Sequence, residues 1–171
     1  MSDLKIELIL KDPEATEALG RALARAFPGA PEGSAALHLT GDLGAGKTTC
    51  VRALLRELGI TGLVRSPTFT LVETYQTKAL SCIHVDLYRL KGPAEVDELG
   101  LRDYMNPECL FLIEWPERAG AALPTADLEL DLSFAESGRR CRLRAGTMLG
   151  EGWLRNLRHD TRLASYLSNL T

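Results

Sequence analysis

The sequence lacks the features that mark membrane-spanning, exported and zinc-binding proteins. No apolar stretch among its 171 residues approaches the roughly 20 residues that a membrane-spanning helix requires. The N-terminal segment has no basic region followed by an apolar stretch and a small-residue cleavage site, so we expect a cytoplasmic protein without membrane contact. The four cysteines form no C-x-x-C pair, and Cys82 and Cys109 lie in apolar runs, which favours buried free thiols over disulfides or zinc.

The length and the 45% apolar content indicate a single domain over residues 1–171. The charge is unevenly distributed along the chain. The region from Arg139 to the end contains seven arginines and two acidic residues, so its net charge is +5 and that of the rest of the chain is −8. A basic region of this kind is typical of a surface that meets RNA or another protein. Arginines of a solvated strand and helix would instead pair locally, and the sequence leaves both interpretations open.

Hydrophobic periodicity predicts an α/β domain with a mixed sheet. Alternating or β-rich runs predict strands over residues 4–10, 34–40, 68–75, 80–88, 109–115, 127–134 and 139–145, of which the last two form a hairpin. Three- and four-residue spacing predicts helices over residues 13–27 and 47–58, a short helix within 92–105, and a closing helix over 150–170.

The stretch GDLGAGKTT, residues 41–49, matches G-x-x-x-x-G-K-[ST] and lies between a predicted strand and a predicted helix. Glycines let backbone N–H groups turn toward phosphate oxygens, Lys47 can reach the β- and γ-phosphates, and the Thr48 hydroxyl can ligate Mg²⁺. The N-terminus of the helix favours the same anion. We therefore expect ATP and Mg²⁺ as ligands, bound by a three-layer P-loop nucleoside-triphosphatase-like domain. Its sheet would be mixed and mainly parallel, with a C-terminal antiparallel hairpin, followed by a helical extension over about residues 147–171.

Two acids end strand-like runs and are candidates for the metal side of this site. Glu114 closes the apolar run LFLIE, and Asp86 closes CIHVD. Ligand sites of parallel sheets lie at the carboxyl ends of the strands, and a buried carboxylate is compensated by Mg²⁺ or its water. A Glu114 paired with Lys or Arg is the alternative. The sequence does not divide metal binding and water orientation between the two acids, and we interpret His84 as a packed strand residue.

The stretch RSPTFTLVE, residues 65–73, is a candidate switch segment. In P-loop nucleotidases the segment after the first helix often holds a polar residue that orders around the γ-phosphate. Ser66 and Thr68 are suitable for this role. A Ser-Pro turn that merely leads into a strand fits the pattern equally well.

These stretches, together with HVDLYRL, ELGLRDY and LIEWPE in that order, resemble the bacterial TsaE (YjeE) ATPases of tRNA threonylcarbamoyladenosine biosynthesis. The resemblance covers roughly residues 35–120, with Arg65, Val85 and Met105 as small departures. It implies a weak Mg²⁺-dependent ATPase that resets a TsaB-TsaD threonylcarbamoyl transferase complex, and that meets tRNA indirectly through that complex.

The resemblance also implies roles for individual residues. Lys47, Asp86 and Glu114 would be catalytic, and Thr48, Glu114 and Asp86 would serve the metal. The residues expected at the nucleotide are Gly41, Asp42, Leu43, Gly44, Ala45, Gly46, Lys47, Thr48, Thr49, Ser66, Thr68, Trp115 and Arg139.

Two other functions stay open. The form G-x-x-G-x-G-K-T also occurs in small-molecule kinases, although the alternating RRCRLR stretch does not look like a kinase lid. A binding module in which ATP only orders the switch segment is the non-enzymatic alternative. A GTPase is disfavoured, because the sequence has no N-K-x-D or T-K-x-D motif.

Overall fold

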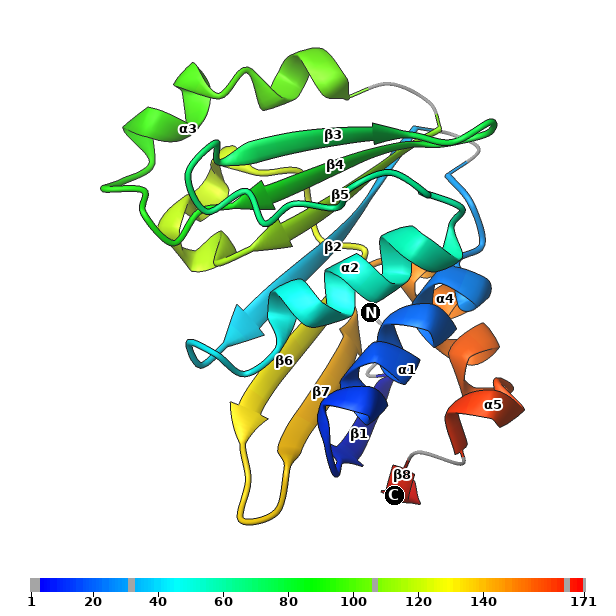
Figure 1. Cartoon of the computed structure of the whole chain (residues 1–171). Helices are drawn as coiled ribbons and strands as arrows, with labels where there is room; N and C mark the ends of the chain where they lie inside the picture. Colours follow the sequence, from blue (N-terminus) through cyan, green and yellow to red (C-terminus); the bar gives the residue numbers. More distant parts are fainter. Residues whose placement is uncertain (1–3, 31–32, 106–107, 165–166, 171) are drawn as a thin grey trace.

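Eight strands form one mixed sheet in the order β3-β4-β5-β2-β6-β7-β1-β8 in the computed structural model, which describes residues 4–30, 33–105, 108–164 and 167–170 (Figure 1). The strands are β1 (Lys5–Leu10), β2 (Ser34–Gly41), β3 (Val72–Gln76), β4 (Ser81–Asp86), β5 (Cys109–Glu114), β6 (Leu128–Phe134), β7 (Arg139–Ala145) and β8 (Leu167–Leu170). The β4/β5, β5/β2 and β2/β6 pairings are parallel, and the four remaining pairings on the two flanks are antiparallel. The predicted α/β fold class with a mixed sheet and the predicted β6–β7 hairpin are confirmed. The sheet is not mainly parallel, however, because its two flanks add four antiparallel pairings to the three parallel ones.

Three helices cover one face of the sheet. They are α1 (Pro13–Ala26), α2 (Lys47–Glu57) and α4 (Met148–Arg158). The first begins where the sequence predicts, because the Asp12 carboxylate accepts a hydrogen bond from the Ala15 N–H at 2.8 Å and Pro13 follows it. α1 and α2 approach closely at Gly20, where an added Cβ would lie 2.2 Å from the Cys50 carbonyl oxygen.

The opposite face is covered over the parallel half of the sheet. The short elements there are α3 (Ala94–Glu98), η1 (Leu101–Tyr104), η2 (Pro116–Arg118) and η3 (Gly120–Ala122). A second apolar core joins Val96, Leu101 and Ala119 of this layer to strand residues such as Phe111 and Ile113. The molecule is therefore three layers thick where the parallel strands lie.

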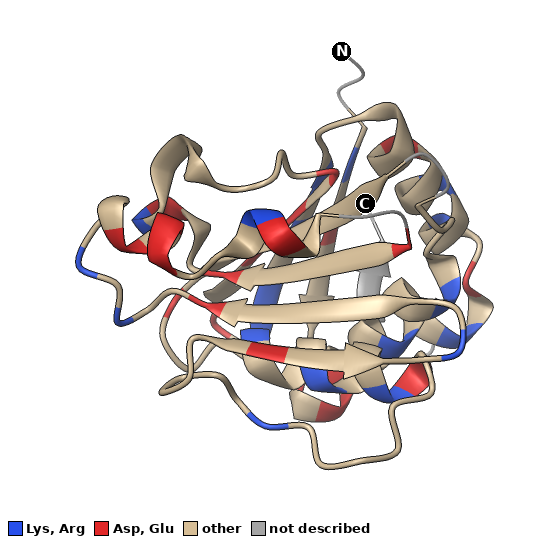
Figure 2. Cartoon of the chain, turned by 90° about the horizontal axis from the view of Figure 1, so that it is seen from above, with Lys and Arg blue, Asp and Glu red and all other residues tan. Residues whose placement is uncertain are grey.

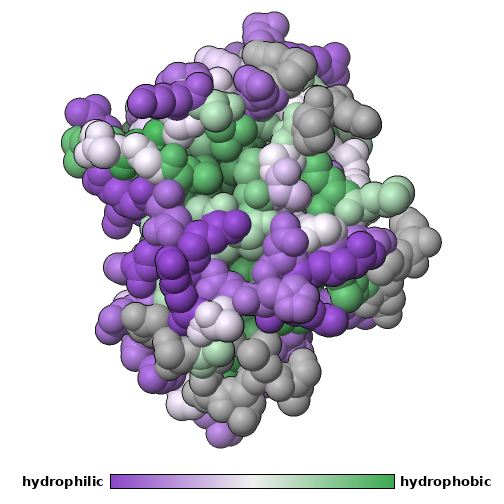
Figure 3. Space-filling view, turned by 90° about the vertical axis from the view of Figure 1, so that its right-hand side faces the viewer, coloured by the Kyte–Doolittle hydropathy of each residue, from purple (hydrophilic) through white to green (hydrophobic). Residues whose placement is uncertain are grey.

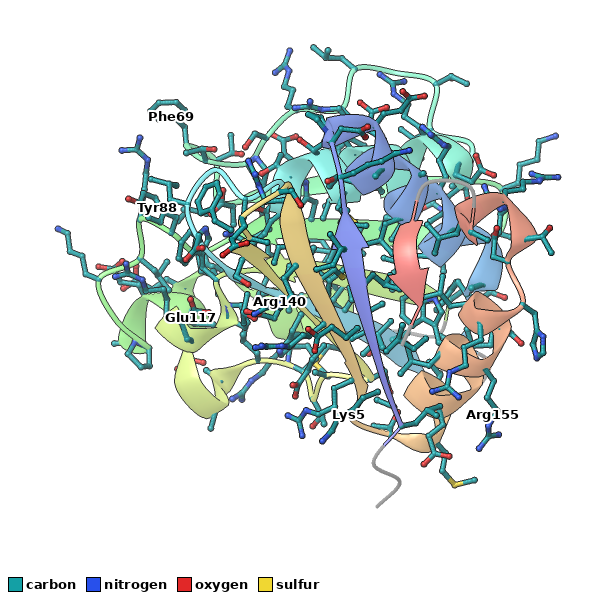
Figure 4. All side chains as sticks on the ribbon, turned by 90° about the horizontal axis from the view of Figure 1, so that it is seen from below. Lys5, Phe69, Tyr88, Glu117, Arg140 and Arg155 are labelled. Atoms are coloured by element: carbon teal, nitrogen blue, oxygen red, sulfur yellow. The ribbon has the colours of Figure 1, made fainter. Side chains whose placement is uncertain are left out.

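On β6, β7 and β1, the face of the sheet that lies opposite α1, α2 and α4 carries charged side chains, most of them exposed. Arg140 (Figure 4) and Arg142 both pair with Glu7 on β1, and Arg144 pairs with Glu129 on β6 at 2.6 Å. The strand register places these residues directly opposite or diagonal to one another. Local ion pairs thus account for three of the four arginines of β7, namely Arg140, Arg142 and Arg144, which favours the second interpretation of the basic region.

The structure corrects two element predictions. The strand predicted over residues 68–75 begins at Val72, because Leu71 has φ 64° and its N–H closes a turn onto the Pro67 carbonyl oxygen at 2.7 Å. The predicted helical extension is helical in α4 and α5 (Thr161–Ala164), but residues 167–170 form β8. Asp160 separates the two helices by accepting the N–H groups of Arg162 and Leu163 at 3.0 Å each. Residues 165–166 and 171 of the predicted extension lie outside the described residues.

Candidate functional site

The glycine-rich turn between β2 and α2 is a P-loop in backbone conformation. Gly41, Gly44 and Gly46 have φ values of 118°, 76° and 113°, which favour glycine. At Gly41 an added Cβ would lie 1.8 Å from the Leu132 carbonyl oxygen, so no other residue fits there. Gly46, at the N-cap of α2, has no side chain to bond the first N–H groups of the helix, which leaves them free to bind an anion.

Lys47 is buried at the first position of α2. Its Nζ donates hydrogen bonds to the Gly41 and Asp42 carbonyl oxygens at 2.8 Å each and lies 3.9 Å from the centre of the Trp115 ring. Burial lowers the pKa of Lys47, and the nearby Glu114 carboxylate opposes this effect. The Lys47 ammonium group therefore contacts the backbone of the same loop that would bind the phosphate oxygens.

Glu114 ends β5 with 2% of its surface exposed. Its Oε1 and Oε2 lie 3.0 and 2.9 Å from the Thr48 hydroxyl, which donates to this carboxylate. His84, which is fully buried, donates from Nε2 to Oε1 at 2.8 Å. Among the described residues no Lys or Arg forms an ion pair with Glu114, so the predicted alternative of a Lys or Arg partner is wrong.

Asp86 lies opposite Glu114 in the parallel β4/β5 register, and acidic residues stand at the strand ends in this part of the sheet (Figure 2). Its Oδ1 accepts the Tyr88 N–H at 3.0 Å. Burial raises the pKa of Asp86; the Tyr88 N–H opposes this effect, and the Glu114 charge adds to it. Among the described residues, no group of three His, Cys, Asp or Glu could hold a metal ion without other donors.

One cavity of about 270 Å³ brings most of the predicted residues together. It is lined by Leu43, Gly44, Gly46, Lys47, Thr48, Thr49, Thr68, Asp86, Tyr88, Glu114 and Trp115. Thr68 enters from the switch segment, and its hydroxyl lies 2.6 Å from that of Ser66. Trp115, at φ 61°, turns the chain after β5 and places its ring 5.0 Å from that of Tyr88.

Arg139 and Ala45 lie on the other side of the P-loop, at a cavity of about 350 Å³. This second cavity is lined by Leu10, Lys11, Asp12, Pro13, Thr16, Gly44, Ala45, Gly46, Thr49, Gly138 and Arg139. Arg139 Nε donates to the Ala45 carbonyl oxygen at 3.2 Å, and the Phe134 N–H donates to Asp42 Oδ2 at 3.0 Å. The β6–β7 hairpin therefore contacts the P-loop through both bonds, and the Asp42 carboxylate is used to bind the hairpin.

Two parts of the site were missed by sequence reasoning. His84 bonds Glu114, and the signal for it was present, since His84 and Asp86 are two residues apart and share a face of β4. The segment 10–16 lines the second cavity, and nothing in its sequence pattern indicated this, because β1 reaches the P-loop through strands that are remote in sequence.

The side of the molecule toward the start of β2 presents apolar side chains within a polar frame (Figure 3). A cavity of about 450 Å³ at the start of β2 is lined by Pro28, Gly29, Ala30, Gly33, Ser34, Met148, Leu149 and Gly152, and it includes none of the motif residues. Within the described ranges, every helix is too short or too polar to span a bilayer.

The fold is that of a P-loop nucleoside-triphosphatase-like α/β protein. The family model described as threonylcarbamoyl adenosine biosynthesis protein TsaE matches residues 10–142, and the chain belongs to this family. The predicted resemblance is thus confirmed.

Similar proteins agree with this assignment. Curated relatives named tRNA threonylcarbamoyladenosine biosynthesis protein TsaE include one from Haemophilus influenzae, 44% identical over 115 residues (67% of this chain, 73% of the relative). Another, from Bacillus subtilis, is 38% identical over 129 residues (75% of this chain, 78% of the relative). The crystal structure of Bacillus subtilis YdiB aligns with a TM-score of 0.74 at 29% identity, over 94% of this chain and 99% of YdiB.

Proposed function

We propose that the protein is a Mg²⁺-dependent ATPase that acts in the cytoplasm in tRNA threonylcarbamoyladenosine biosynthesis, where it resets a TsaB-TsaD-type transferase complex. The observation that carries the proposal is the Thr48–Glu114 contact at 2.9–3.0 Å beside Lys47 in one cavity. A hydroxyl at the start of the P-loop helix and a carboxylate at the end of a neighbouring strand form the metal side of P-loop nucleotidases. Family membership supports the tRNA role.

The residues present fit Mg²⁺. This ion takes oxygen ligands and is usually held by one or two carboxylates together with substrate phosphates. Thr48 and Glu114 would hold it, with Asp86 one strand away. When bound, the ion supplies positive charge against the β- and γ-phosphate oxygens.

The protein groups would divide the remaining work. Lys47 and the loop N–H groups bind phosphate oxygens and balance the charge that spreads over them during transfer to water. Asp86 has one oxygen bonded to Tyr88 and lines the same cavity, so it is placed to accept a hydrogen bond from an attacking water. On this proposal Glu114 serves the metal, and Asp86 orients the water.

The second cavity would hold the nucleoside. Its wall includes Gly44–Gly46 of the P-loop, so a nucleotide with its phosphates in the loop could extend into it. Arg139 contributes to the same wall and stacks on Phe134 at 4.3 Å. Arg139 would then contact the sugar or base and leave the γ-phosphate to Lys47.

Exposed apolar side chains next to the P-loop cavities support action with a partner protein. Leu43, Phe69 and Phe134 are 63%, 84% and 53% exposed and belong to the P-loop, the switch segment and the β6–β7 hairpin. Exposed apolar groups at one site are typical of protein interfaces. A partner that covers them would order the switch segment, so we expect hydrolysis by the isolated protein to be slow.

Phosphate release from ATP tests the proposal, with and without a TsaB-TsaD-type complex. We expect Mg²⁺-dependent release that rises when the complex is added. Transfer of the phosphoryl group to an added small acceptor would favour a kinase instead. Mg²⁺-dependent binding without release under either condition would favour a nucleotide-gated binding module.

A further inference from the structure

His84 is a fully buried polar side chain in the middle of the sheet. Its Nε2 lies 2.8 Å from Glu114 Oε1, and its Nδ1 has no hydrogen-bond partner among the described residues. The bond to Glu114 is therefore the polar contact that orients the ring. Burying a ring nitrogen without a partner is unfavourable, so the position is poorly explained by packing alone.

Strand register explains how the two side chains meet. His84 on β4 is paired with Leu112 on β5, and Glu114 lies two residues further along β5 on the same face. Such diagonal neighbours are within reach of long side chains. The contact is thus built into the sheet, and it does not depend on the P-loop.

The His84–Glu114 hydrogen bond restricts rotation of the Glu114 carboxylate about its last side-chain torsion. The terminal torsion of a glutamate carboxylate has broad minima, so a single contact to Thr48 would leave the plane of the carboxylate poorly defined. With Oε1 held by His84, both oxygens stay within 3.0 Å of the Thr48 hydroxyl.

We propose that His84 is a positioning residue for the magnesium site, which fixes the Glu114 carboxylate toward Thr48 by donating the Nε2 hydrogen bond. This inference rests on the proposed function of the same site. Groups that orient metal ligands in this way typically contribute roughly 10- to 100-fold to metal affinity or activity.

Two substitutions separate positioning from packing. In His84→Gln the side-chain amide can reach as far as Nε2 and donate to Glu114, whereas in His84→Asn the shorter amide cannot. We expect His84→Asn to need at least about 10-fold more Mg²⁺ for half-maximal ADP binding. We expect His84→Gln to stay close to wild type. ADP binding is measured by calorimetry over a MgCl₂ series, and ADP binding in EDTA should be the same in all three proteins.

His38 provides a matched control. It also has a buried ring nitrogen without a partner among the described residues, Nε2. It is paired with Ile113 in the β2/β5 register, and so it lies on the opposite face of the sheet from Glu114. His38→Asn should leave the Mg²⁺ requirement unchanged. Circular dichroism and melting temperature verify that each variant is folded.

The outcomes separate the inference from the proposed function. Equal Mg²⁺ requirements in folded His84→Asn, His84→Gln and wild type would overturn the role of His84, as would ADP binding by wild type that does not depend on Mg²⁺. Absence of ATP hydrolysis by the wild type with its partner would refute the ATPase proposal, while the Mg²⁺ dependence of ADP binding would still decide on His84.

Discussion

At the scale of single residues, the buried Glu114 is the clearest link between sequence and chemistry. A buried carboxylate is unfavourable unless it is hydrogen-bonded or paired with a cation. Here it accepts hydrogen bonds from a hydroxyl and an imidazole, and no Lys or Arg of the described residues forms an ion pair with it. Neither contact brings a Lys or Arg side chain to the carboxylate, so its charge is one that a metal ion would balance.

Replacing Glu114 with Gln keeps the size of the side chain and removes the charge. We expect Glu114→Gln to lower ATP turnover by at least about 100-fold, a loss of about 2.7 kcal/mol of transition-state stabilisation. ATP affinity should change far less, because Lys47 and the loop N–H groups remain. Steady-state phosphate release and calorimetric binding measure the two quantities. Normal turnover in this variant would remove Glu114 from the metal role.

Asp86→Asn tests the other acid. If Asp86 orients water, the variant should lose turnover and keep the Mg²⁺ requirement of the wild type, because Thr48 and Glu114 are untouched. Phosphate release at several MgCl₂ concentrations measures both. A higher Mg²⁺ requirement would instead assign Asp86 to the metal.

At the scale of elements, Asp160 joins the C-terminal helices to α1. Its Oδ2 accepts from Arg25 Nε at 2.8 Å, and Arg25 also pairs with Glu57 of α2 at 2.9 Å. Burial by itself would raise the pKa of Asp160, but the Arg25 bond and two backbone N–H groups outweigh it, and the pKa falls below its ordinary value of 3.8. Because the pKa of Asp160 is lower in the folded state, its ionised form stabilises the fold at pH values above the ordinary pKa. This contribution is lost as the pH falls through the folded-state pKa.

Asp160→Asn should therefore destabilise the protein at pH 7 by about 1–2 kcal/mol. Asparagine still caps α5, so the change isolates the charge. The difference from wild type should shrink below pH 4, measured by urea unfolding across pH. Glu17→Gln is the control, since Glu17 forms an exposed pair with Arg21, and we expect less than about 0.5 kcal/mol. An equal loss in both variants would contradict the prediction.

The elements also show what the sequence could predict. α1, β6 and β7 carry strict periodicity and local signals, such as the Asp12 cap, and they form as predicted. β3 and the C-terminal segment do not, because the positive φ of Leu71 and the pairing of β8 with β1 arise from tertiary structure. The P-loop residues were predictable from their spacing. The His84–Glu114 bond and the Asp42 contact to the hairpin depend on strand order, which the sequence does not reveal.

At the scale of the whole molecule, the two most exposed large apolar side chains, Phe69 and Met148, belong to different parts of the surface. Phe69 belongs to the switch segment, and its ring centre lies 4.6 Å from Cζ of Arg89. Met148, 88% exposed, lines the cavity at the start of β2. If the partner covers the nucleotide site, the first surface matters for stimulation and the second does not.

We expect Phe69→Ser to leave the phosphate release of the isolated protein unchanged and to reduce stimulation by the TsaB-TsaD-type complex at least about 10-fold, as loss of an interface aromatic does. Met148→Ser is the matched control and should be stimulated like wild type. Phosphate release is measured over a range of complex concentrations. Equal stimulation of both variants would show that the partner docks elsewhere.

The strand order also governs how the chain folds as it is synthesised. β1 completes its pairing with β7, about 130 residues further along the chain, and with β8 near its end. At roughly 5–20 residues per second, a ribosome needs roughly 6–26 s to make the intervening stretch. Through that interval the apolar face of Ile6, Leu8 and Leu10 has no strand beside it. The apolar face of β1 therefore gains its first strand neighbour only when β7 has been made.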